Sequence, residues 1–234
     1  MEDPLEGRRK YFELLDFSKF AFPSVLSLDA PATALALLER LGGKSFMSYG
    51  QIWPRMEDIV RGFATDSYIV NEFKAYTAPW KNESIRNVVR LLRCHFGGKG
   101  TWYPEKSKPK FVLGFWFKPS IRGIWFFEGK AYAVLINARK GQALTDEDIR
   151  FLARGIYELY CRDDPNDPIP LIIDLSEHEK GKDRELRVRV VPAENAASIE
   201  ELEHAIKQFV GALNLAGIAQ PLPPSLDILS LFKR

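Results

Sequence analysis

Residues 111–137 contain three apolar runs in close succession: FVLGFWF (111–117), IRGIWFF (121–127) and AYAVLIN (131–137). Two more runs, IPLIIDL (169–175) and LRVRVV (186–191), follow after a helical stretch at 146–161. Dense β-branched and aromatic residues are typical of strands, and this is the only part of the chain dense enough to form a sheet core. A further helix over 198–215 completes a βββαββα order. The sequence therefore predicts an α+β fold with a mixed sheet flanked by helices.

The remainder of the chain is predicted to be mainly helical. Pro31 fits the first turn of a helix that follows Ala30, and helices are also expected over about 54–63, 67–76 and 84–95. The Gly-, Lys- and Pro-rich stretch at 97–110 predicts a loop. These expectations divide the chain into a helical region (1–100), a sheet domain (101–220) and a Pro-rich break with a short apolar tail (221–234).

Composition places the chain among ordered globular proteins, with 46% hydrophobic and 27% charged residues in 234. The charged start of the chain argues against a signal peptide, and no run approaches the roughly 18 apolar residues that span a bilayer. Cys94 and Cys161 form no CxxC pair, which disfavours a zinc site and favours a reducing compartment. We therefore expect a cytoplasmic protein without a membrane partner.

Charge is concentrated in residues 81–110, where eight lysines and arginines stand against two glutamates. This segment alone carries +6, whereas the whole chain carries +2. Trp80, Phe96, Trp102 and Tyr103 are interleaved with the cations, and the combination of cations with aromatic rings is typical of nucleic-acid surfaces. The predicted contacts are Arg86, Arg90, Arg93, Lys99, Trp102, Lys106, Lys108 and Lys110. The alternative is that the cations only solvate a helix face, with the aromatic rings turned into the core.

The glycines of FGGKGT (96–101) invite a phosphate-loop interpretation, but the GxxxxGK[ST] spacing is absent. A segment that follows a helix is more typical of a helix C-terminus, with Gly97 or Gly98 at positive φ.

The order of strands, helix and strand resembles the core of the PD-(D/E)xK nuclease family. That resemblance implies an acid on the second strand and an E-x-K on the third, which together hold a divalent metal such as Mg²⁺. The third strand instead ends Ile136-Asn137-Ala138-Arg139-Lys140, without a carboxylate. The nearby Glu128-Gly129-Lys130 is better interpreted as a hairpin turn. The resemblance thus leaves two alternatives, a metal-dependent phosphodiesterase and a degenerate relative that only binds. Outside the nuclease alternative we expect no cofactor and no metal.

An acidic cluster around Asp174, Glu177 and His178 follows the fourth of these strands and is the first candidate for catalysis. The mixed charges of SEHEKGKDRE (176–185) also fit a solvated hairpin connection. The tail at 222–234 offers a third function, docking on a protein partner through its apolar residues. The leading hypothesis is a non-catalytic nucleic-acid-binding or accessory subunit.

Overall fold

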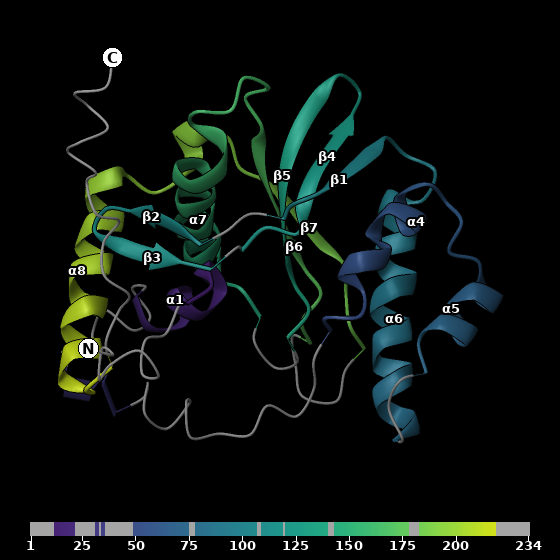
Figure 1. Cartoon of the computed structure of the whole chain (residues 1–234), viewed down its shortest axis with the longest axis horizontal. Helices are drawn as coiled ribbons and strands as arrows, with labels where there is room; N and C mark the ends of the chain where they lie inside the picture. Colours follow the sequence, from purple (N-terminus) through teal and green to yellow (C-terminus); the bar gives the residue numbers. More distant parts are fainter. Residues whose placement is uncertain are drawn as a thin grey trace, which may run out of the picture.

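The computed structural model describes residues 12–21, 31–32, 34–35, 49–74, 78–106, 109–118, 120–139, 143–177 and 183–218. Its centre is a five-stranded sheet in the order β1-β4-β5-β6-β7 (Figure 1). The β5–β6 pair is parallel, and the other neighbours are antiparallel. A second, two-stranded sheet pairs β2 with β3. Helices together with a mixed sheet confirm the predicted α+β class.

The strands are β1 (Thr101–Pro104), β2 (Lys110–Val112), β3 (Phe115–Phe117), β4 (Gly123–Phe127), β5 (Lys130–Asn137), β6 (Ile169–Asp174) and β7 (Arg187–Val190). The helices are α1 (Leu14–Ala21), α4 (Met56–Val60), α5 (Asp66–Glu72), α6 (Pro79–Phe96), α7 (Asp146–Ile156) and α8 (Ile199–Leu215). A π-helical turn at Tyr157–Cys161 extends α7, and short 3₁₀ turns lie at Trp53–Arg55 and Ala193–Asn195.

The central sheet is covered on both faces (Figure 1). On one face, α1, α7, α8 and the β2–β3 hairpin share a core that includes Phe17, Phe115 and Phe209. On the other face, α4, α5 and α6 pack through residues such as Ile59, Ile69 and Val89. Alternation along β5 sends Leu135 to the first core and Val134 to the second. The helices that precede β1 therefore bury their apolar stripes against the sheet.

Several local features are formed by residues that lie close together in the sequence. Ser198 and Glu201 form a capping box that starts α8, and Thr145 and Asp148 form another that starts α7. Glu128 and Gly129 have φ of 50° and 72° in the two-residue turn that joins β4 to β5. These angles suit a type I′ turn and confirm the hairpin.

Three local predictions were wrong. FVLGFWF is not one strand but the β2–β3 hairpin, since Leu113 and Gly114 have φ of 51° and 80°. Part of the predicted loop at 97–110 is strand β1, which pairs with β4. Helix α6 begins at Pro79 rather than after Ser84, because proline suits the first helical turn, where its missing N–H would be unbonded.

Two predictions fall largely outside the described residues: the helix after Ala30 and the tail at 222–234. Among the described helices, none combines the length and apolar character needed to cross a membrane.

We expect Phe209→Ala to lower the free energy of unfolding by about 3–5 kcal/mol. The Phe209 ring lies 5.2 Å from Phe12, 5.3 Å from Phe17 and 5.6 Å from Phe115, so its loss leaves a cavity between α8, α1 and the hairpin. Chemical denaturation measures the change. Leu215→Ala on the same helix is the control, because Leu215 is 62% exposed and should change stability by no more than about 0.5 kcal/mol.

Candidate functional site

The carboxyl ends of β5 and β6 bring together the strongest cluster of buried polar groups. The two strands are parallel, and the register pairs Asn137 with Asp174 at their last positions. Both side chains are buried, at 1% and 2% exposure. They lie on the sheet face that α7 covers, because Leu135 and Ile172, two positions earlier, belong to the core on that face.

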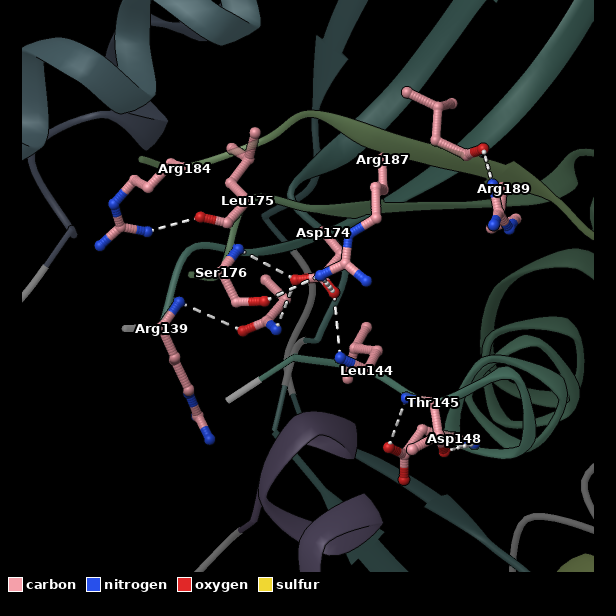
Figure 2. Close-up of polar contacts among 12 residues, drawn as sticks. Arg139, Leu144, Thr145, Asp148, Asp174, Leu175, Ser176, Arg184, Arg187 and Arg189 are labelled. Carbon is pink, nitrogen blue, oxygen red and sulfur yellow. Dashed lines mark hydrogen bonds and ion pairs between the residues drawn. The ribbon is translucent and has the colours of Figure 1, made fainter. Parts of the chain in front are cut away.

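Asp174 is the centre of this cluster (Figure 2). Its Oδ1 accepts hydrogen bonds from Asn137 Nδ2 at 2.9 Å and from the Ser176 N–H at 3.1 Å. Its Oδ2 accepts from the Leu144 N–H at 3.0 Å and from Arg187 Nη2 at 2.7 Å. Arg187 stands opposite Asp174 on β7, so the carboxylate joins both neighbouring strands to the segment that enters α7.

These four bonds use the roughly four acceptor positions that a carboxylate offers. Asp174 therefore has no lone pair left with which to bind a metal or take a proton unless part of the cluster breaks. Glu177 is partly buried after the strand, and His178 lies outside the described residues. The catalytic grouping of Asp174, Glu177 and His178 stays a prediction, and the bonding of Asp174 gives it a structural role.

A second set of charged groups surrounds the end of β5. Arg139 Nη1 lies 2.7 Å from Asp16 Oδ1, and its Nη2 lies 3.6 Å from Glu13 Oε2. Glu13 also lies 3.6 Å from Arg122 Nη2, and the Arg122 guanidinium stands 4.7 Å from the centroid of the Trp53 ring. Burial lowers the pKa of Arg122, while the carboxylate of Glu13 opposes that shift. Two arginines and two acids thus form a connected ion-pair network.

The metal ligands that the nuclease resemblance implies are not assembled by these strands. Strand β4 (GIWFF) contains no acid, and Glu128 is exposed in the β4–β5 turn. Where the resemblance puts E-x-K, β5 ends at Asn137 and is followed by Ala138 and Arg139. Among the described residues, no group of three or more His, Cys, Asp or Glu side chains could hold a metal ion.

The arginines of the predicted basic face are joined to neighbouring residues. Arg90 lies 2.6 Å from Glu83 Oε1, and Arg86 lies 3.6 Å from the same carboxylate. The hydrogen bond from Arg90, together with the charge of that arginine, lowers the pKa of Glu83. Arg86 also donates to the Val70 carbonyl at 3.0 Å.

Arg93 donates to the Ala64 carbonyl at 3.0 Å and lies 3.0 Å from Asp66 Oδ1. Arg86 and Arg93 therefore hold α6 against the segment that contains α5.

The loop after α6 has exposed side chains, but several of its backbone groups are hydrogen-bonded within the protein. Lys99 is exposed, while its carbonyl accepts a 2.8 Å hydrogen bond from Trp125 Nε1. Gly98 has φ of 71°, which confirms the helix C-terminus interpretation, and its N–H donates to Val60. The Lys99 N–H donates to Phe96. Two backbone donors that a phosphate loop would need are thus used within the protein.

The remaining predicted contacts are spread over the molecule. Trp102 is only 4% exposed and lies over Gly123, where an added Cβ would stand 2.5 Å from its ring, so the expectation that it stacks on bases is corrected. Lys106 is exposed and Lys108 lies outside the described residues. Lys110 belongs to β2, where its Nζ donates to the Leu159 carbonyl at 2.7 Å. The exposed aromatic residues near the segment are Trp80 at 57% and Tyr103 at 56%.

Sequence reasoning missed Glu13, Asp16 and Arg122 altogether. The only local signal is the arginine inside the apolar run IRGIWFF, which requires a partner once the strand is buried. Its partners lie about a hundred positions earlier in the chain, where no periodic pattern connects them.

Comparison with known proteins gives little further identification. No known family model matches the chain, and no curated protein matches it. Among solved structures, the chain is similar to a protein from Eubacterium rectale described as a "Putative exonuclease", at 10% sequence identity. The match covers 99% of this chain and 91% of that chain with a TM-score of 0.44. Similarity at this level assigns neither a family nor an activity.

We expect Asp174→Asn to lower the free energy of unfolding by about 3–5 kcal/mol, because it leaves Arg187 without its buried counter-charge. Denaturant titration followed by fluorescence measures the change. Asp183→Asn, at an exposed site of the β6–β7 connection, is the matched control. Unchanged or increased stability in Asp174→Asn would contradict a structural role and would favour a functional carboxylate.

The two cysteines are both free and should differ in reactivity. Burial raises the pKa of the Cys161 thiol to about 12, so it stays protonated at pH 8, whereas Cys94 is exposed. Ellman's reagent at pH 8 should therefore modify Cys94 rapidly and Cys161 only after unfolding. Cys94→Ala should abolish the rapid phase, and a rapid phase that persists in this variant would contradict the assignment.

Proposed function

We propose that this protein binds nucleic acid through the surface of residues 78–106 and does not cut it. The observation that carries the proposal is that this surface, with six lysines and arginines against two glutamates, offers exposed cations together with exposed aromatic rings. Lys99 and Lys106 supply positive charge for phosphates, and Trp80 and Tyr103 supply rings on which unpaired bases stack.

The α6 arginines contribute to the field of this surface while keeping their structural partners. An ion pair does not remove the arginine from the surface, and Arg93 still exposes 30% of its side chain and Arg90 36%. A phosphate that approaches can share these guanidinium groups, since each presents five N–H donors. Lys99 and Lys106 have exposed side chains and are therefore the residues to test.

We expect no cutting because of the residues at the end of β5. The sheet has three antiparallel strands, β1, β4 and β5, followed in space by the parallel strand β6, although β1 takes the place that the sequence comparison gave to FVLGFWF. At the position where a metal would need hard oxygen anions, this chain has an amide and a guanidinium. The nearest buried carboxylate, Asp174, has its acceptors filled. We therefore interpret the chain as a degenerate relative of the nuclease class that retains binding.

The test is fluorescence anisotropy with labelled single- and double-stranded DNA and RNA at two salt concentrations, in the presence of Mg²⁺. Lys99→Glu combined with Lys106→Glu should weaken binding and reduce the slope of log affinity against log salt by about 2. Lys207→Glu is the matched control, because Lys207 is 78% exposed on α8, across the sheet from α6 (Figure 1).

An internal readout shows whether the charge reversal acts locally. Burial and, secondarily, the charge of Lys99 lower the pKa of His95, so the Lys99→Glu change should raise the pKa of His95 measured by NMR. Binding that is unchanged in a variant with this shift would refute the proposal. A probe found cut on a denaturing gel after the binding measurement would instead support the phosphodiesterase alternative.

A further inference from the structure

A groove lies on the side of the molecule that carries α7, between strand β2 and the π-helical turn that ends that helix. Its volume is about 510 Å³. One wall is the whole of β2, and the other is the turn at 158–160 with the residues at 163–165 that follow it. None of these residues lies in the surface at 78–106 that we propose binds nucleic acid. Lys110 was among the contacts predicted from the sequence, but it lies outside that surface.

Strand β2 presents an open edge to this groove. The hairpin closes with the pair Val112 and Phe115, so Phe111 and Trp116 form the next, non-hydrogen-bonded pair. In such a pair the backbone N–H and C=O point away from the partner strand. Phe111 thus offers one donor and one acceptor outward. The far edge of β3 is different, because the Lys118 N–H donates to Phe12 and Phe12 bridges to Phe117.

The opposite wall of the groove is acidic. Glu158, Asp163 and Asp164 line it, against Lys110 as the one lining cation. Lys110 is already held, with Nζ 2.7 Å from the Leu159 carbonyl and 4.3 Å from the centroid of the Tyr160 ring. Glu158 is 6% exposed and pairs with Arg154 at 3.3 Å and Arg162 at 3.0 Å. The two aspartates give the rim its excess of negative charge.

We propose that this groove binds an extended peptide of a partner protein that carries lysine or arginine. The peptide adds a strand to β2 by exchanging backbone hydrogen bonds with Phe111, which is the common mode of strand addition at a free edge. Alternate side chains of the added strand then face the groove, where basic ones meet Asp163 and Asp164. The others lie beside the exposed Phe111, whose ring packs on the partly buried Trp116.

The probe for this proposal is a ¹⁵N-labelled sample of the whole chain titrated with the peptide acetyl-Thr-Val-Lys-Val-Lys-Val-Thr-amide. The same peptide with both lysines replaced by glutamate is the control ligand. The lysine peptide should shift the Phe111 amide resonance and slow its hydrogen exchange, because that amide gains an acceptor. The glutamate peptide should bind at least fivefold more weakly.

Two variants test the open edge of β2 and the negative charge of the groove independently. Phe111→Pro removes the outward N–H donor, which the hairpin itself does not use. It should weaken binding of the lysine peptide about fivefold, which is the equivalent of one hydrogen bond. Asp163→Lys should weaken the lysine peptide and strengthen the glutamate peptide. Asp183→Lys, an equal charge change at an exposed site of the β6–β7 connection, should leave both affinities unchanged. Thermal melting confirms that each variant is folded.

Several results would overturn the proposal. Equal affinity for the two peptides would do so, as would binding that leaves the Phe111 amide unaffected. A third such result is no binding at about 1 mM peptide, since a dissociation constant of that size corresponds to a binding free energy of only roughly 4 kcal/mol. Binding that arises only after deletion of residues 219–234 would show that the chain's own C-terminal segment, with Lys233 and Arg234, takes this place.

Discussion

The buried carboxylate of Asp174 is the interaction on which the arrangement of the sheet depends. A charge at 2% exposure is stable only when hydrogen bonds replace its lost hydration, and here four donors do so. They come from β5, from Ser176 two residues after β6, from β7 and from Leu144, one residue before the capping box of α7. A single side chain therefore fixes the register of three strands and the point at which the crossover helix begins.

The parts of this fold that could be predicted from the sequence are those that depend on nearby residues. The Ser198–Glu201 capping box, the Glu128-Gly129 turn and the apolar stripe of α7 are each formed by residues that are close together in the sequence. The hairpin inside FVLGFWF was missed because Leu113, rather than a typical turn residue, takes positive φ beside Gly114. The start of α6 was misplaced because Ser84 is a good N-cap residue, although Pro79 already begins the helix.

The candidate sites were harder to predict because the position of a charged residue in the sequence does not reveal which residues it contacts in the fold. Arg86, Arg90 and Arg93 share a helix face, as their spacing indicates, yet Arg93 is held by Asp66 and Ala64 from an earlier segment. Asp174 was found from its place at a strand end, but its role depends on Arg187 and Leu144, which only the folded chain brings together. The same residue type can bind a partner in one place and hold the fold together in another, and burial and bonding distinguish the two roles.

Strand edges give a further constraint on where this protein meets other molecules. An unpaired edge invites association, and folded proteins protect most of theirs. Here β1 packs against α4 and ends in Pro104, and β3 is bridged by Phe12. On β7, the Arg189 side chain reaches the carbonyl of Val188 on its own strand. Strand β2 has no such cover among the described residues, and its edge opens into a groove rather than onto a flat surface. An open edge beside Asp163 and Asp164 favours a particular partner over chance association, because a strand with basic side chains can complete both the backbone hydrogen bonds and the charge.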